Sequence, residues 1–331
     1  MNTRVRWEFW SLVLATTLAL SHAAPPSRAA PPPEPADARH PVPSWADHER
    51  AKARIGESYL AEMRAAKTPE EKAALARRMF DRAATADDDP ARQYELASIT
   101  LNYAATIGDV DVAFAAVDLI ARRFQFDPLT ARAFAVKELD RWTTPRESAP
   151  VLVRGALSVV NDAVRADRYD VAKEAVAVAV EAAKRVPKDD DLAKRAATRA
   201  ADVDAIAKAY RESRPAFEQL KRNPLDVDAA AAAGRFLCLA KGDWTAGLKF
   251  LVEVDDPAIK AAARLDVAGA PDGPGRARIA DAWWDVGERT PHGLARRQIH
   301  RRAAEWYNRA ADQLTGYSKT RAQQRVASVV Q

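Results

Sequence analysis

The side chains that most often build metal and catalytic sites are few in this chain and lie far apart along it. Histidine occurs five times. His292 and His300 are eight residues apart, so they share one face of a helix. A zinc site takes about four ligands, and the chain has neither an HxxxH pair nor paired cysteines. We therefore expect no metal site and no cofactor. The other three are His22 in an N-terminal apolar segment, His40 in a proline-rich stretch, and His48 beside Glu49 at an exposed-looking helix start.

The one cysteine of the chain, Cys238, is the most direct candidate for a nucleophile. It lies between Leu237 and Leu239, at a position where related segments of the chain carry small residues. A buried structural thiol fits this context better than a reactive one. A single cysteine also rules out a disulfide within the chain, so helix packing must provide the stability.

Two features of the chain could suggest a hydrolytic site or a phosphate-binding loop: a pair of acids and a glycine-rich turn. Asp281 and Asp285 are one helical turn apart, but no second acidic element or sugar-binding loop accompanies them. We expect both carboxylates to solvate a helix. The stretch 273–275, Gly-Pro-Gly, precedes a helix but lacks the Lys-Ser/Thr of a phosphate loop, so we interpret it as a turn.

Aromatic residues near the C-terminus offer a possible sugar-stacking platform. Their helical spacing favours packing in a core, with the tryptophan N–H groups bonded to aspartates or to the backbone. Neighbouring residues Trp283 and Trp284 cannot face the same way, so one of them is expected to be exposed. The residues of this set are Trp244, Trp283, Trp284, Trp306 and Tyr307.

A run of arginines follows the aromatic residues and suggests an anionic partner. Glu305 and Asp312 lie on the same predicted helix, so a solvated, mixed-charge face is the favoured interpretation. The arginines of this stripe are Arg296, Arg297, Arg301, Arg302 and Arg309.

The elements that carry these residues are predicted to be helices throughout. Hydrophobic residues make up 48% of the chain, much of this fraction is alanine, and only 7% of residues are aromatic. Alanine favours helix, and alternating patterns bounded by hairpin turns are missing. The chain is therefore predicted to be all-α. The net charge is only +5, from 51 basic and 46 acidic residues, and no groove-reading motif accompanies it. We therefore expect no nucleic-acid binding.

The N-terminus has the pattern of a secretory signal peptide. Arg4 and Arg6 precede the apolar run 9–20, and 21–23, Ser-His-Ala, suits cleavage after Ala23. This predicts a secreted, periplasmic or cell-envelope protein with residues 1–23 removed. An uncleaved signal anchor is the alternative, although the run is short for a membrane span. Residues 24–43 hold eight of the twenty prolines and are predicted to be a disordered linker.

Residues 44–188 are predicted to form helical hairpins. Ser44 suits the N-cap of a helix to about Ala66, and Thr68 followed by Pro69 begins a second one that ends near Ala84. Three later helix pairs then flank turns at residues 108–109, 167–170 and 242–243. Small residues come four before and five after each turn start, and apolar ones nine and twelve after it. The aligned positions are Ala104, Ala163 and Cys238; Ala113, Ala172 and Gly247; Val117, Val176 and Leu251; and Ile120, Ala179 and Val254.

These helix pairs resemble tetratricopeptide (TPR) repeats, in which each hairpin buries its face against a neighbour. The turn, the small residue that follows it and the proline-containing exits match this pattern. The first-helix small position does not match, because Leu101, Val160 and Arg235 occupy it. The unit spacings of 59 and 75 residues also miss the period of about 34. The prediction is a degenerate, TPR-like array.

Residues 189–222 are predicted to form a long connecting helix, bent or restarted near Ser213 because Pro215 removes a backbone donor. A C-terminal TPR-like helical module follows at 223–331. Its expected helices are 257–266, 277–288, 291–314 and 318–329, with a loop at 268–275. The module contains nine of the twelve glycines and four of the eight tryptophans, and we expect it to be the best-packed part of the molecule.

Four segments of this module carry a resemblance to a known group of proteins. They are Gly234–Leu251 (GRFLCLAKGDWTAGLKFL), Ala282–Asp285 (AWWD), Arg302–Tyr307 (RAAEWY) and Leu314–Gly316 (LTG). Together they resemble uncharacterised secreted or envelope proteins of planctomycete-type bacteria, over about residues 87–326. The resemblance implies an exported helical fold and supplies no active site.

The function expected from these features is an exported, non-enzymatic scaffold for protein interaction or assembly. Its partner is expected to be a protein, and neither nucleic acid nor an integral membrane span after signal cleavage is expected. The alternatives are binding of envelope polysaccharide through the C-terminal aromatic residues, and an enzyme of a type that no motif reveals.

Overall fold

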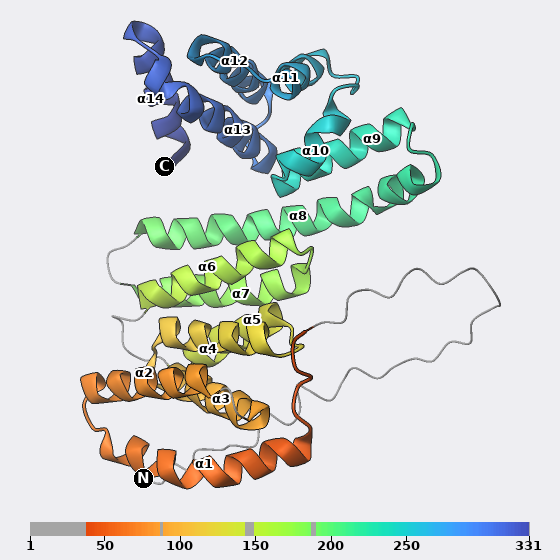
Figure 1. Ribbon diagram of the computed structural model, residues 1–331. Coiled ribbons are helices and arrows are strands. Elements are labelled where there is room, and N and C mark those ends of the chain that lie inside the picture. Colours follow the sequence, from red (N-terminus) through yellow and green to blue (C-terminus); the bar gives the residue numbers. More distant parts are fainter. Residues whose placement is uncertain (1–37, 87–88, 143–148, 187–189, 331) are drawn as a thin grey trace, which may run out of the picture. The chain divides into compact units, whose positions relative to one another are not determined.

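Helices account for nearly all of the chain that the structure describes. The computed structural model describes residues 38–86, 89–142, 149–186 and 190–330 (Figure 1). Within these ranges the only β pairing is an isolated parallel bridge between His40 and Phe124. The all-α prediction is therefore confirmed. The predicted signal peptide and most of the predicted linker lie outside the described residues.

The helices follow one another with short connections. Their bounds are α1 Trp45–Ala65, α2 Pro69–Thr85, α3 Pro90–Ile107, α4 Val110–Arg123, α5 Pro128–Trp142, α6 Ala149–Arg165, α7 Tyr169–Ala183, α8 Asp190–Arg222, α9 Val227–Gly234, the π-helix η3 Arg235–Lys241, α10 Trp244–Leu251, α11 Pro257–Ala268, α12 Gly273–Arg289, α13 Leu294–Ala310, the 3₁₀ turn η4 Ala311–Gln313 and α14 Gly316–Val330.

Local capping chemistry sets the first two helices. The Ser44 hydroxyl accepts the Asp47 N–H at the start of α1. Thr68 and Glu71 form a reciprocal capping box at the start of α2, directly before Pro69 in the first turn. Both predicted starts are confirmed, and both predicted ends fall within one residue of the observed ones.

The predicted linker includes two residues that belong to the folded body. His40 donates its backbone N–H to the Arg123 carbonyl at 2.8 Å and accepts the Gln125 N–H at 2.8 Å. The Arg39 guanidinium donates to the Ala121 carbonyl at 3.0 Å. The folded body therefore begins before Ser44, because the chain at His40 forms backbone hydrogen bonds with residues at the end of α4.

Helix α3 is buried almost on all sides, since it contacts α1, α2, α4 and α5. Three of its buried polar side chains bond within the helix or to a neighbouring helix. Ser98 and Thr100 donate to the carbonyls four residues earlier at 2.8 and 2.7 Å. Gln93 donates to the Ala83 carbonyl of α2 at 3.1 Å.

The three predicted hairpin turns join paired helices: α3 with α4, α6 with α7, and η3 with α10. Gly108 and Gly242 adopt left-handed backbone at φ 78° and 81°, and the aspartate after each glycine caps the next helix. In the middle turn Asp167 takes this conformation, at φ 56°. All twelve positions aligned from the sequence are buried.

Close helix approach explains why small residues recur at these positions. A Cβ added to Gly247 would lie 2.6 Å from Cys238 Sγ and 2.6 Å from Leu237 Cβ. The corresponding Ala113 and Ala172 are completely buried. Any larger side chain here would have to separate the two helices.

Neighbouring hairpins are linked through their turns. Arg168 of the second turn pairs with Asp127, the residue before α5, at 3.2 Å. Lys241 of the third turn donates to both carboxylate oxygens of Asp167 in the second, at 2.8 and 2.9 Å. The Lys241 side chain is only 9% exposed, and Tyr169 also donates to Asp167, at 2.6 Å. The second and third turns therefore share one polar cluster.

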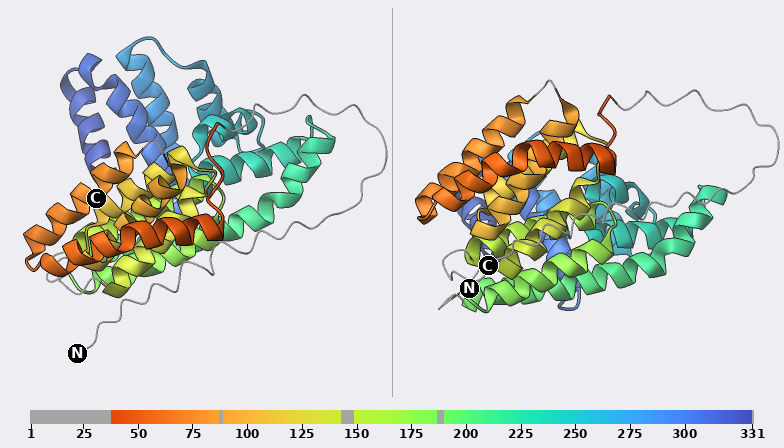
Figure 2. Two further views of the ribbon diagram at one scale, coloured as in Figure 1. Left: turned by 60° about the horizontal axis from the view of Figure 1, so that its bottom comes forward. Right: turned by 90° about the horizontal axis from the view of Figure 1, so that it is seen from below.

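Helix α8 runs for 33 residues with Pro215 inside it (Figures 1 and 2). Of the two predicted alternatives near Ser213, a restart is wrong, since the helix is continuous through this point, and a bend stays a prediction. The Ser213 hydroxyl donates to the Tyr210 carbonyl at 3.0 Å. Helix α8 contacts α7 on one side and α9 and η3 on the other, as expected of a connecting helix.

The C-terminal module packs around its tryptophans. Helices α12 and α13 run side by side, with α11 against α12 and α14 against α13 (Figures 1 and 2). Trp283 is completely buried and meets Trp244 edge to face, with 4.9 Å between the ring centroids. The prediction of a turn before the helix at 273–275 is wrong, because all three residues belong to the first turn of α12. Asp272 caps this helix by accepting the Gly275 N–H at 2.6 Å.

Candidate functional site

The strongest polar arrangement of the module surrounds Asp266 of α11, whose side chain is 1% exposed. Arg302 of α13 binds both of its oxygens, through Nη2 at 2.7 Å and Nε at 2.8 Å. Trp283 donates its indole N–H to the same carboxylate at 2.7 Å. The guanidinium of Arg302 also lies over the rings of Trp244 and Trp306, at 5.6 and 5.7 Å.

This arrangement is a closed ion pair with every charged oxygen engaged. A bidentate arginine and an indole donor satisfy the carboxylate, and the aromatic rings cover the guanidinium. No oxygen of Asp266 is left to contact a ligand. The Asp266 cluster therefore holds α11, α12 and α13 together and does not resemble a catalytic acid.

A second carboxylate, Asp281 of α12, joins α13 and α14. It accepts from Arg321 at 2.6 Å, from Arg325 at 2.7 Å and from the Tyr307 hydroxyl. Burial and the hydrogen bond to Asp281 raise the pKa of Tyr307. The expectation that Asp281 only solvates a helix is wrong, because α14 brings two arginines to it. Asp285 has no part in this cluster, so the two acids do not form a catalytic pair.

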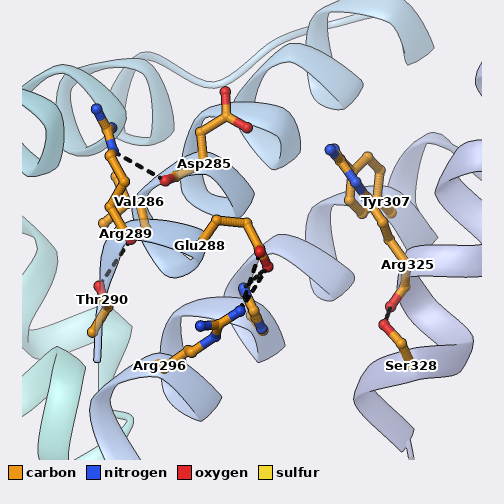
Figure 3. Close-up of polar contacts among 10 residues, drawn as sticks. Asp285, Val286, Glu288, Arg289, Thr290, Arg296, Tyr307, Arg325 and Ser328 are labelled. Carbon is orange, nitrogen blue, oxygen red and sulfur yellow. Dashed lines mark hydrogen bonds and ion pairs between the residues drawn. The ribbon is translucent and has the colours of Figure 1, made fainter. Parts of the chain in front are cut away.

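His300 lies in a narrow slot between two helices. Its ring stacks on Trp284 with the centroids 4.3 Å apart and the planes 10° from parallel. A Cβ on Gly287 would lie 2.2 Å from the ring, so the α12 backbone closes the other side. Glu288 lies 3.3 Å from Nε2 and also binds Arg296 at 3.1 Å through each oxygen (Figure 3).

The electrostatics of this slot disfavour a charged imidazole. Burial lowers the pKa of His300, and Arg296 and Arg325 lower it further, while Glu288 acts in the opposite direction. Arg325 lies over Trp284 at 4.9 Å from the ring centre. Its guanidinium also donates to the Tyr307 hydroxyl, and the two side chains lie next to each other (Figure 3). His292 lies before α13, so the prediction that it shares a helix face with His300 is wrong.

The predicted aromatic platform is not presented to solvent. Trp283, Trp244, Trp306 and Tyr307 are at most 7% exposed, which agrees with the core interpretation. Trp284 is partly buried, and His300 and Arg325 pack on its ring, so the prediction that one of the two neighbouring tryptophans is exposed is wrong. The predicted hydrogen bond from a tryptophan to an aspartate is confirmed at Trp283. It is wrong for Trp306, whose buried indole N–H has no partner among the described residues.

The five arginines of the stripe do not form one solvated face. Arg296 binds Glu288 of α12, Arg297 binds Asp202 of α8, and Arg302 binds Asp266 of α11. The side chain of Asp202 is only 4% exposed. Arg309 lies over Trp306 at 4.8 Å, and Arg301 is exposed. The solvated-face prediction is therefore wrong for Arg296, Arg297 and Arg302, because α8 and α11 supply buried acids and α12 supplies the exposed Glu288.

Cys238 is completely buried against α10, where Gly247 leaves room for its sulfur. Burial raises the pKa of its thiol, so the thiolate needed for nucleophilic attack is disfavoured. The interpretation as a structural thiol agrees with this placement.

One buried pair was missed in the sequence. His48 Nδ1 lies 2.7 Å from an oxygen of Glu95, whose side chain is 3% exposed. His48 was expected at an exposed helix start, but its side chain is 17% exposed and lies near the ring of Tyr94. Burial raises the pKa of Tyr94 to about 12. The sequence signal for this pair was Glu95, a single acid inside the apolar segment of α3, because a buried carboxylate needs a partner.

Across the described ranges, no group of three or more His, Cys, Asp or Glu residues could hold a metal ion. In the same part of the chain, no helix is long and apolar enough to cross a membrane. Comparisons of the chain with family models, with curated proteins and with solved structures found no match.

Proposed function

We propose that this chain is an exported, non-enzymatic scaffold for protein interaction or assembly, built from degenerate TPR-like hairpins. The observation that carries this proposal is that the second and third hairpin turns each bind an aspartate from an earlier part of the chain. Arg168 reaches back to Asp127, and Lys241 reaches back to Asp167. Repeat proteins present extended surfaces because each unit contacts its neighbours in this way.

The state of the reactive side chains supports a structural role for them. The carboxylates Asp266 and Asp281 are held by arginines and aromatic donors, and the Cys238 thiol is buried. A catalytic centre needs a group that is free to meet its substrate. In these clusters the charged groups are already bound to each other, so none is free to contact a substrate.

The proposal of export rests on the N-terminal sequence pattern and on the resemblance to secreted planctomycete-type proteins, which we propose as the chain's relatives. Expression with the native N-terminus, followed by intact-mass measurement of the exported protein, tests this part. A mass that begins at Ala24 would support it. A protein retained in the cytoplasm with residues 1–23 intact would contradict it.

The interaction part is tested by affinity capture from the envelope and secreted fractions of the source cell, read by mass spectrometry. Lys241→Met is compared with the wild type, and Arg289→Gln of exposed α12 surface serves as the control. We expect one reproducible protein partner that wild type and Arg289→Gln retain and Lys241→Met loses while still folded by circular dichroism. A blank with all three baits, or capture unaffected by Lys241→Met, would contradict the scaffold proposal.

A further inference from the structure

A shallow hollow of about 240 Å³ lies where the start of α14 meets α12 and η4. It is smaller than the ~300 Å³ typical of the smallest pockets for drug-sized ligands, so its size suits one ring and not a large molecule. Its lining is mixed polar and apolar. The polar lining residues are Arg278, Asp281, Gln313, Thr315, Ser318 and Arg321.

Positive charge exceeds negative charge around this hollow. Asp281 is already bound by Arg321 and Arg325, so its single charge is shared by two guanidinium groups. Arg278 is exposed at the rim and makes no ion pair or hydrogen bond with any residue that the structure describes. The Nε of Arg321 is buried and also has no partner within these described ranges. The exposed, unpaired guanidinium of Arg278 points to an anionic group as its partner.

An exposed aromatic ring lies beside these arginines. Tyr317, between the lining residues Thr315 and Ser318, is 78% exposed and is the second most exposed large apolar side chain of the described residues. The Arg321 guanidinium lies 5.9 Å from its ring centre. An aromatic face next to hydroxyl, amide and guanidinium donors suits a ring with one apolar face and polar edges.

We propose that this hollow binds an anionic sugar residue, a ring bearing a carboxylate or a sulfate ester. Arg278 and Arg321 hold the charge, Tyr317 covers the apolar face of the ring, and Gln313, Thr315 and Ser318 bond its hydroxyl groups. This site differs from the tryptophan platform expected from the sequence, whose rings are buried. It does not depend on the scaffold proposal, because the binding residues lie outside the hairpin turns.

The test is calorimetric titration of the full chain with three sugars: trigalacturonate, sulfated galactotriose and neutral galactotriose. Arg278→Gln and Tyr317→Ala remove a charge and a ring that contribute no buried packing, so both variants should fold. Arg278→Gln is expected to weaken binding of the charged sugars about tenfold through loss of one charge-assisted contact. Tyr317→Ala is expected to weaken it by up to about tenfold through loss of the aromatic contact with the ring. Arg289→Gln, on the same helix as Arg278, is the matched control and should bind within about twofold of wild type.

Binding of either charged sugar that falls with added salt and with both variants would support the site, and the tighter of the two would identify the preferred charge. Equal binding of galactotriose would contradict the anionic requirement. Inorganic sulfate that binds as tightly as the charged sugars would contradict the sugar requirement. Absence of binding at millimolar concentration, or an equal loss in Arg289→Gln, would overturn the proposal.

Discussion

The α6/α7 hairpin and the C-terminal module bury their cores by different chemistry. Every buried residue of α6 and α7 is alanine, valine, leucine or tyrosine. The module instead packs tryptophans around Asp266, which is nearly inaccessible and held by Arg302. The hairpin depends on the close approach of two backbones, and the module depends on the pairing of specific charges. The first should be sensitive to volume and the second to loss of a partner.

The largest expected effect is the loss of the Arg302 charge in the module. Arg302→Met leaves the Asp266 carboxylate buried with only the Trp283 N–H as a partner. The free energy of unfolding should fall by about 3–5 kcal/mol, measured by urea denaturation. The exposed pair of Arg264 with Glu253 is the control, and Arg264→Met should cost no more than about 1 kcal/mol. Similar losses for the two variants would contradict the buried-pair account.

The next effect is overpacking in the hairpin. Ala172 is completely buried between α6 and α7, so Ala172→Leu must separate the helices. We expect a loss of about 1–3 kcal/mol in the free energy of unfolding. Glu174→Leu places the same side chain at an exposed position two residues later and should change stability by less than about 0.5 kcal/mol. An Ala172→Leu protein as stable as wild type would show that the two helices do not approach closely.

The third hairpin, η3 with α10, belongs to the C-terminal module but also depends on the close approach of two helices. Its small residue, Gly247, lies against the Cys238 thiol. Gly247→Ala places a methyl group against Cys238 and Leu237 and should destabilise by about 1 kcal/mol, at the lower end of overpacking effects. Gly56→Ala in α1 meets nothing within 4 Å and should stabilise by about 0.5–1 kcal/mol through helix propensity. Thermal melts of both variants measure the contrast. A stabilising Gly247→Ala would contradict the close approach at the third turn.

The smallest effect is the pH dependence that His300 adds to the module. Its pKa is lowered in the folded state, so the unfolded chain takes up a proton first as the pH falls. The stabilising contribution is complete above the ordinary value of 6.5 and is lost as the pH falls toward the lower folded pKa. Between pH 7 and pH 5, about the range in which histidine titrates, His300→Gln should lose less stability than wild type. An identical pH profile would contradict the lowered pKa.

Local signals in the sequence were enough to predict much of the fold. Ser44 and the Thr68–Pro69 pair set the first two helices through capping, and the aligned small residues indicated which helices pair. Of the bend or restart predicted in α8, the restart is wrong, because the contacts of this helix with α7, α9 and η3 outweigh the loss of one backbone donor at Pro215.

The candidate site was less predictable, because its partners come from distant parts of the chain. Arg297 meets Asp202 across 95 residues, and Arg302 meets Asp266 across 36. Arginines spaced along one helix therefore resembled a solvated face when considered on that helix alone. The position of Cys238 was predictable because the small-residue pattern of the hairpins is local to each turn.

The scaffold account depends most on the contact between the second and third hairpin turns. A double-mutant cycle with Asp167→Asn and Lys241→Met, measured by urea denaturation, tests that contact directly. Asparagine tolerates the left-handed backbone at this position, and methionine keeps the length of the lysine side chain. The account predicts a coupling of about 1 kcal/mol or more. If the two single-variant losses of stability add to within about 0.3–0.5 kcal/mol, the two turns do not interact, and the proposed contact between neighbouring hairpins would be contradicted.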